Sequence, residues 1–216
     1  MKDFYLIRHG QSRANAGFPA VSPYEEALTE LGEKQARLTA AHLTKTPDLI
    51  VTSTYLRTHQ TSAPTREKFP DAKHEIWPIE EFHQLNPEVE HGLTIEKMIP
   101  LFQDHWGRYD PHYTNGGGSE SWAGMLSRID AFEEHLRSTS AGLVYAFSHG
   151  FFIKTFLVKH ALGSTELAMN MEGLDHLMNG VFWVGNCAIT HGVVTDEGKI
   201  LVGRYSNHHI PENMRT

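Results

Sequence analysis

Apolar residues are grouped into short continuous runs along the chain, and two of these runs end in the same way. Residues 4–7 are apolar and lead directly into Arg8-His9-Gly10. Residues 142–147 form a second such run, followed by Ser148-His149-Gly150. An apolar run that stops at a glycine is typical of a buried strand, and a run without polar interruption is typical of a strand covered on both faces. The pattern therefore predicts two buried strands, each ending in a His-Gly pair.

Capping residues predict the helices of the first half of the chain. Thr29 is a suitable N-cap for a helix that ends near residue 45. Ser53 or Thr54 is expected to cap a second helix, which carries Arg57 in its first turn. Pro64 is expected to kink this second helix or end it early, because proline removes a helical hydrogen bond and clashes with the preceding turn.

Further strands are predicted on both sides of the chain's middle. Residues 48–52 are rich in β-branched side chains, and residues 74–79 alternate in polarity. Since Pro78 cannot donate to a strand ladder, the second of these is expected at a sheet edge. Residues 186–194 and 199–204 are predicted to be two strands joined by a turn.

The second half of the chain also carries helix signals. Ser119 or Ser121 is expected to open one helix, and a further helix over residues 151–162 is expected to stop at Gly163. Ser164 can cap another short helix. Strands that alternate with helices predict an α/β fold, a three-layer α/β/α sandwich with helices on both faces of a mostly parallel central sheet. The last two strands could run antiparallel to the others.

Residues 80–119 differ in character from the rest of the chain. They are rich in His, Trp, Tyr, Pro and Gly, with one helix expected near residues 94–102. We interpret them as a lid insertion that covers a sheet edge, within a single domain of residues 1–216. The tail from residue 207 is expected to be loose.

Composition limits the classes of function. The chain has 216 residues and a formal net charge of −7, with no long basic run, which argues against nucleic acid or an anionic membrane as a partner. An anionic ligand would therefore need a local basic pocket. The single cysteine, Cys187, excludes an internal disulfide, and the N-terminus lacks the apolar stretch of a signal peptide. We expect a cytoplasmic protein.

The two strand ends carry residues suited to phosphoryl transfer. A neutral imidazole such as that of His9 or His149 can attack phosphorus and form a phosphohistidine. Arg8 and Arg57 can each meet two phosphate oxygens at once, and the helix start at Gly150 can offer a backbone N–H. Taken singly, each histidine could equally be a structural residue at a strand end, and Arg57 could be a surface ion-pair partner.

Several ordered motifs together resemble the histidine phosphatase superfamily, which has the phosphoglycerate mutase-like fold. They run from residue 4 to about residue 190. The motifs are Leu6-Ile7-Arg8-His9-Gly10-Gln11-Ser12-x-x-Asn15, Leu28-Thr29-Glu30-x-Gly32-x-x-Gln35-Ala36, Thr52-Ser53-x-x-x-Arg57-Thr58-x-Gln60-Thr61, Gly118-Ser119-Glu120-Ser121, Phe147-Ser148-His149-Gly150 and Asn186-Cys187.

The resemblance implies a role for each residue of the strand ends. His9 would be the phosphorylated nucleophile, and Arg8, Arg57 and His149 would bind the phosphoryl oxygens. The remaining pocket groups implied by the resemblance are Ser12, Asn15 and the Gly150 amide. No metal or other cofactor is expected, because the protein's own cations supply the positive charge.

The resemblance also implies a glutamate that protonates the leaving group and later activates water. Glu81 fits best, because it precedes Phe82 as in related phosphatases, and Glu80 is the second choice. Both could instead be solvated residues of the predicted lid.

Three other functions remain open. A mutase of this family needs a basic cluster in the insertion, whereas residues 80–119 offer only Lys97 and Arg108 among many acidic residues, so hydrolysis of a small phosphorylated metabolite is favoured. A non-catalytic phosphate-binding protein would be expected to lack a pocket histidine or arginine. A metal site at His208-His209 with His191 is disfavoured, because adjacent histidines in a strand or loop point apart. The oligomeric state is open, with a homodimer as one possibility.

Overall fold

The first apolar run lies in strand β1 (Lys2–Arg8), at the centre of a six-stranded sheet with the order β3-β2-β4-β1-β5-β6. The computed structural model describes residues 1–171, 174 and 183–216. Strand β1 pairs in parallel with β4 (Leu143–Ser148), the second predicted buried strand, and every residue of β4 is buried. The two runs that suggested core strands are thus neighbours in the sheet.

The sheet is mostly parallel, as predicted. Strand β2 (Leu49–Thr52) is parallel to β4 on one side and to β3 (Lys73–Ile76) on the other. Strand β3 is exposed and lies at the edge, which confirms the edge-strand prediction. Of the last two strands, β5 (Ile189–Val194) is antiparallel to β1, and β6 (Ile200–Ser206) is antiparallel to β5.

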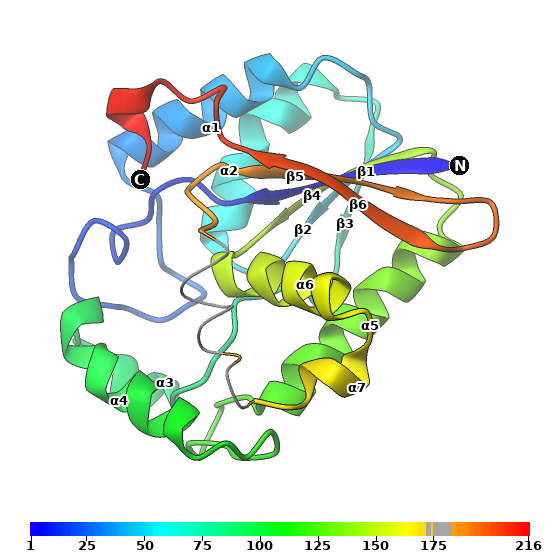
Figure 1. Cartoon of the computed structure of the whole chain (residues 1–216). Coiled ribbons are helices and arrows are strands. Elements are labelled where there is room, and N and C mark those ends of the chain that lie inside the picture. The colour runs from blue at the N-terminus through cyan, green and yellow to red at the C-terminus, as the bar shows by residue number, and fades with distance from the viewer. Residues whose placement is uncertain (172–173, 175–182) are drawn as a thin grey trace.

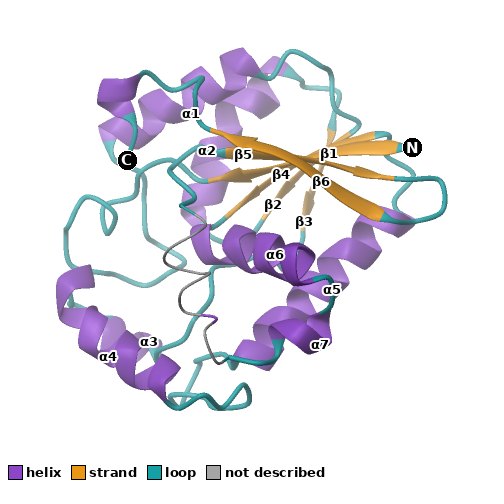
Figure 2. Ribbon diagram, in the orientation of Figure 1, coloured by secondary structure: helices purple, strands orange, loops and turns teal. Residues whose placement is uncertain are grey.

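Helices cover both faces of this sheet, which confirms the three-layer α/β/α prediction (Figures 1 and 2). Helices α1 (Glu30–His42) and α2 (Leu56–Lys68) lie on one side, and α5 (Trp122–Ser138), α6 (Gly150–Leu162) and α7 (Thr165–Ala168) lie on the other. Two hydrophobic clusters fill the layers. The larger joins Phe4 and Leu6 to residues of α5 and α6, and the smaller contains Ile7 and Phe147.

The helix boundaries correct three predictions. Thr29 is the N-cap of α1, as predicted, but α1 ends at His42, because Leu43 turns extended. Tyr55, and neither Ser53 nor Thr54, is the N-cap of α2. Pro64 lies inside α2 without ending it. The following turn stays helical because Thr61, Ser62 and Thr65 are buried, so tertiary packing outweighs the one lost hydrogen bond.

The later helices begin and end close to the predicted residues. Ser121 caps α5, its side chain accepting a hydrogen bond from the Gly124 N–H. Helix α6 begins one residue earlier than predicted, at Gly150, and stops at Gly163, whose φ of 91° is left-handed. Ser164 caps α7. No helix in the described ranges is both long and apolar enough to cross a membrane.

Residues 80–119 contain α3 (Pro87–Glu90) and α4 (Ile95–Gly107), which lie apart from the sheet in Figure 1. Helix α4 continues five residues beyond the predicted end at residue 102. The segment is joined to the loop after β1 by two backbone bonds, from Ala20 N–H to Leu93 O at 2.8 Å and from Gly92 N–H to Ala20 O at 2.9 Å.

The prediction of a loose tail is wrong. Ile210 is fully buried, and a short 3₁₀ helix, η2 (Glu212–Met214), follows it. The Gln35 side chain donates to Met214 O at 2.7 Å, and the Thr216 hydroxyl donates to Asn186 Oδ1 at 2.9 Å. Polar partners spread over distant parts of the chain hold the tail, and no local sequence pattern reveals them.

Candidate active site

His9 and His149 follow the ends of the neighbouring strands β1 and β4. The parallel register pairs Arg8 with Ser148, so the next residue of each strand is a histidine at the same sheet edge. The His9 N–H donates to Ser148 O at 2.9 Å, and the two imidazole ring centroids lie 5.2 Å apart. Both side chains are almost completely buried. The structure therefore brings together the two histidines that the sequence singled out.

The surroundings of His9 prepare it to act as a nucleophile. Its Nδ1 lies 2.7 Å from Gly10 O, and since a carbonyl can only accept, Nδ1 carries the proton. The lone pair is then on Nε2. Burial, and after it the positive charges of Arg57 and Arg8, hold the pKa of His9 well below its usual value. The ring is thus neutral at physiological pH, the state that can attack phosphorus.

Two guanidinium groups accompany the histidines. Arg8 Nη1 donates to Val184 O at 2.6 Å, and the Arg8 Nε is buried without a partner among the described residues. Arg57, the second residue of α2, is 7% exposed and donates from Nη1 to Pro23 O at 3.1 Å. Burial lowers the pKa of both arginines. Groups that stay cationic in such an environment favour an anionic ligand.

His149 is held by a serine from the next strand end. Its Nε2 lies 2.8 Å from the Oγ of Ser53, which follows β2, while Nδ1 is buried with no partner in the part of the chain that the structure describes. Burial, Arg57 and His9 hold the pKa of His149 well below its usual value. An anion bound beside it would reverse part of this effect, because negative charge favours the protonated ring.

Glu81, and not Glu80, lies with the histidines. The ligand atoms of His9, Glu81 and His149 are all within 4.8 Å of one another. Glu81 Oε1 accepts hydrogen bonds from the Phe151 N–H at 2.8 Å and the Phe82 N–H at 3.1 Å. Glu80 Oε1 instead accepts from the backbone and hydroxyl of Thr54, at 3.1 and 3.0 Å. The geometry thus separates the two candidates for the acid.

Ser12 and Asn15 lie in the loop after β1 and form a small polar network. Asn15 Oδ1 accepts from Asn186 Nδ2 at 3.0 Å and from Arg8 Nη2 at 3.4 Å, and the Asn15 N–H donates to Ser12 Oγ at 3.2 Å. Asn186 Nδ2 also donates to His9 O at 3.0 Å. Asn15 therefore orients its neighbours through its oxygen, which leaves its amide N–H groups for a ligand. Asn186 matched a family motif, but its role as a link between His9 and Asn15 was not predicted.

Glycines permit the close backbone approach that these positions need. A Cβ on Gly32 in α1 would lie 2.2 Å from Gln11 O, so only glycine lets α1 pack against the loop that carries Ser12. A Cβ on Gly150 would lie 3.2 Å from Arg8 Nε. Gly150 thus makes room for a guanidinium at the start of α6.

These residues line a cavity of about 290 Å³. Arg8, His9, Arg57 and Glu81 lie on it, together with Ser12 and Asn15, whereas His149 is fully buried and does not line it. Four further polar side chains on the cavity, Glu26, His83, Gln84 and Glu90, were not predicted. Nothing in their local sequence sets them apart from ordinary surface residues, and only the fold brings them together.

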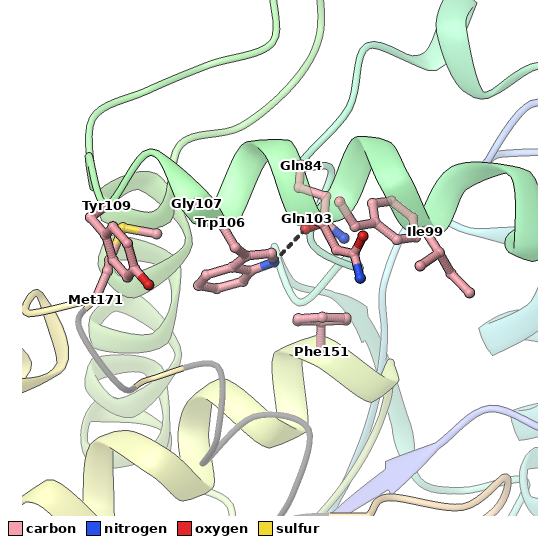
Figure 3. Close-up of a pocket in the computed structure, with 9 residues that line it drawn as sticks. Gln84, Ile99, Gln103, Trp106, Gly107, Tyr109, Phe151 and Met171 are labelled. Atoms are coloured by element: carbon pink, nitrogen blue, oxygen red, sulfur yellow. Dashed lines mark hydrogen bonds between the residues drawn. The ribbon is translucent and has the colours of Figure 1, made fainter.

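A second cavity of about 530 Å³ opens beside the first (Figure 3). Gln84, Phe102 and Phe151 line both cavities. Trp106 of α4 donates from its indole N–H to Gln84 Oε1 at 2.7 Å, and its ring stacks on Phe151. Side chains of residues 80–119 thus separate the two cavities.

Two histidines and a carboxylate are also ligands that a metal ion can use. Within the described ranges, His9, Glu81 and His149 are the only such group. The adjacent charges of Arg8 and Arg57 disfavour a cation there and favour an anion. In the disfavoured alternative site, His191 Nε2 bonds Asp3 at 2.6 Å and His209 Nε2 bonds Thr39 at 3.1 Å, so both already have partners.

Comparison with known proteins supplies independent information. The sequence profile of the histidine phosphatase superfamily (branch 1) matches residues 4–202. A curated relative, phosphoserine phosphatase 1 of Hydrogenobacter thermophilus, is 27% identical over 63% of this chain and 65% of its own length. The chain thus matches slightly less than two thirds of that protein.

Solved structures share the fold over nearly the whole chain. A phosphoserine phosphatase variant of Entamoeba histolytica, in complex with phosphoserine, covers 98% of this chain and 100% of its own, with a TM-score of 0.71 and 20% identity. A mycobacterial glucosyl-3-phosphoglycerate phosphatase in complex with VO₃ covers 94% and 98%, with a TM-score of 0.70 and 22% identity. At these identities the similarity establishes the fold and leaves the substrate open.

Proposed function

The chain belongs to the histidine phosphatase superfamily, and we propose that it is a phosphomonoester hydrolase that works through a phosphohistidine on His9. Family membership confirms the resemblance inferred from the sequence, and the relatives described above are phosphatases and not mutases. The observation that carries the mechanism is the neutral His9, with its proton fixed on Nδ1 between two buried arginines.

In the first step, His9 Nε2 attacks the phosphorus and the bond from phosphorus to the ester oxygen breaks. Arg8, Arg57 and His149 neutralise the equatorial oxygens, and the amide groups of Asn15 and Gly150 donate hydrogen bonds to them. Glu81, protonated at this stage, gives its proton to the departing oxygen. Its backbone bonds both fall on Oε1, which leaves Oε2 for the transfer.

In the second step, water attacks the phosphohistidine. Glu81, now a carboxylate, accepts a proton from the water, the bond between His9 Nε2 and phosphorus breaks, and inorganic phosphate leaves. The enzyme returns to its starting state with a neutral His9 and a protonated Glu81. The cycle needs no metal or other cofactor, so activity is expected to persist in a chelator.

The cavity favours hydrolysis over the mutase reaction. None of the described residues from 80–119 on the cavity is Lys or Arg, and Arg108 forms an exposed ion pair with Asp104. A second anionic group on the substrate would therefore lack a partner outside the phosphate site. The non-catalytic alternative is disfavoured because every group of the predicted machinery is present.

The remaining expectations stay predictions. We propose a small phosphorylated metabolite as substrate, a cytoplasmic location, and residues 80–119 as a lid over the cavity, supported by their bonds to the loop after β1. A homodimer is one possible assembly.

Rapid quenching of the enzyme with labelled p-nitrophenyl phosphate tests the mechanism. We expect an acid-labile, alkali-stable phosphoenzyme, as a phosphohistidine would be, and its absence in His9→Ala, with turnover reduced by about 10⁴-fold or more. His91→Ala, which removes an exposed histidine, is the control. Turnover by His9→Ala at the wild-type rate would exclude His9 as the nucleophile. Conversion of 3-phosphoglycerate to its 2-isomer, measured alongside, would support the mutase alternative.

A further inference from the structure

Two carboxylates that the proposed mechanism does not use lie on the same cavity as His9. Glu26 comes from the loop that precedes α1, and Glu90 is the last residue of α3. They reach the cavity from segments more than sixty residues apart in the sequence. Their common position needs an explanation, because the rest of the site is arranged to bind an anion.

Glu26 is 5% exposed, and only one of its oxygens has a partner. Its Oε1 accepts from the Ala14 N–H at 2.7 Å, whereas Oε2 is buried with no hydrogen bond among the described residues. A buried carboxylate oxygen without a donor has lost its hydration and gained no hydrogen bond in return. A ligand that brings a hydrogen-bond donor into the cavity would remove this penalty.

Glu90 is in a similar position. Burial, followed by the negative charge of Glu81, raises its pKa to about 7, with Arg57 acting in the opposite direction. The same two neighbours belong to the proposed catalytic machinery, so Glu90 lies close to the reacting groups. Arg57 thus compensates the ionised form of this carboxyl group only in part in the unliganded protein.

The other walls add no positive charge to offset these carboxylates. The only Lys or Arg residues on the cavity among those described are Arg8 and Arg57, and both are needed for the phosphoryl group. Apolar side chains from the loop after β1 and from α4, including Val21, Ile95 and Met98, complete this part of the cavity. A leaving group with a carboxylate of its own would meet two negative groups here that Arg57 offsets only in part.

We propose that Glu26 and Glu90 bind the leaving group, and that they select phosphomonoesters whose leaving group carries hydroxyl donors over those whose leaving group carries a carboxylate. The substrate class is then the phosphate esters of polyols and sugars. This inference rests on the proposed function, since it assigns a leaving-group site to the same hydrolase.

Glycerol 3-phosphate and 3-phosphoglycerate form a matched pair for the test, because they differ mainly in a hydroxymethyl group in place of a carboxylate. At pH 8, where Glu90 is ionised, we expect kcat/KM for glycerol 3-phosphate to be at least about tenfold higher. In Glu26→Gln and Glu90→Gln, which keep the shape and remove the charge, the ratio should fall about tenfold, mainly through faster turnover of 3-phosphoglycerate. Glu25→Gln and Glu88→Gln, at exposed neighbouring positions, should leave the ratio unchanged.

The outcomes are distinguishable. A ratio that stays the same in both cavity variants, or a wild-type preference for 3-phosphoglycerate, would overturn the selection by these carboxylates. A higher kcat/KM for phosphoethanolamine than for glycerol 3-phosphate would overturn the hydroxyl class in favour of an ammonium group. If Glu26→Gln does not fold, the ratio of the two kcat/KM values in Glu90→Gln alone decides whether the carboxylates select the leaving group. Failure of the proposed function is recognised separately, since wild-type protein would then release no phosphate even from p-nitrophenyl phosphate.

Discussion

The carboxylate of Glu81 accepts a hydrogen bond from the backbone N–H of Phe151 at 2.8 Å. Phe151 is the second residue of α6, and the N-cap of that helix is His149. One helix start thus positions both the proposed acid and a histidine that we propose to bind phosphate.

Glu81→Gln should therefore separate substrates by their leaving groups. A glutamine keeps the acceptor for the Phe151 N–H but cannot exchange a proton. We expect kcat to fall about 10²–10⁴-fold for an alkyl phosphate, whose alkoxide must be protonated, and less for p-nitrophenyl phosphate. The ratio of the two kcat values is the measurement. Glu80→Gln is the matched control, and a larger loss in Glu80→Gln than in Glu81→Gln would reassign the acid.

Asn186→Ala tests the polar network behind the phosphate site. The Asn186 amide donates to both His9 O and Asn15 Oδ1, so its removal frees the backbone of the proposed nucleophile and the side chain of a proposed phosphate ligand. We expect kcat/KM for p-nitrophenyl phosphate to fall about tenfold to a hundredfold, and the free energy of unfolding to fall by about 1–3 kcal/mol.

Asn115→Ala provides the comparison for this variant. It removes an amide that accepts from the Asn86 N–H and donates to the Tyr113 hydroxyl, in a loop that does not line the cavity. Equal losses of kcat/KM in the two variants would show that Asn186 acts only through general stability.

The sequence predicted the parts of the site that depend on strand ends. Local patterns predict the positions of Arg8, His9 and His149, because an apolar run followed by a glycine indicates both a buried strand and the residue at which it ends. The mostly parallel direction of the sheet follows from the alternation of strands and helices, whereas the order of the strands does not.

The contributions of Asn186, Glu26 and Glu90 could not be predicted in this way. Each is brought to the site by contacts between segments that are distant in sequence. None of them stands in a local sequence pattern that distinguishes it from a surface residue. The docked tail is a similar case, since Gln35 and Asn186 hold it from other elements. Pro64 is the opposite case. The local sequence predicts a kink or an early end of the helix there, but the helix continues through it because its neighbours are packed in the interior.

The stability of the protein should fall at acidic pH, partly because of His83. Burial, then Arg57 and Arg128, lowers the pKa of His83 to about 4 from its usual value of 6.5. Between these two values the unfolded chain binds a proton that the folded protein does not, so the free energy of unfolding decreases as pH falls through this window. One such group lowers the free energy of unfolding by up to about 1.4 kcal/mol for each pH unit of acidification within this window.

His83→Gln should remove this share of the pH dependence. Urea unfolding at pH 7 and pH 5 is the measurement, and the loss of stability between them should be smaller in the variant. His9 and His149, whose pKa values are also lowered, act in the same direction, so a residual dependence is expected. His91→Gln, at an exposed position, serves as control. An unchanged pH dependence in His83→Gln would contradict the assignment.

Gly150→Ala should lower activity without lowering stability. The new Cβ would lie 3.2 Å from Arg8 Nε and 3.4 Å from its Cζ, closer than side chains usually approach, while Arg8 is held by its bond to Val184 O. The guanidinium must therefore shift from the position in which we propose that it binds phosphate. We expect kcat/KM for p-nitrophenyl phosphate to fall about tenfold.

The backbone at Gly150 is helical, so alanine should keep or raise the unfolding free energy, by about 0.4–1 kcal/mol. Gly117→Ala, where the nearest atom would be 3.8 Å away, is the control, and wild-type kcat/KM in Gly150→Ala would show that the close approach of Arg8 is not needed.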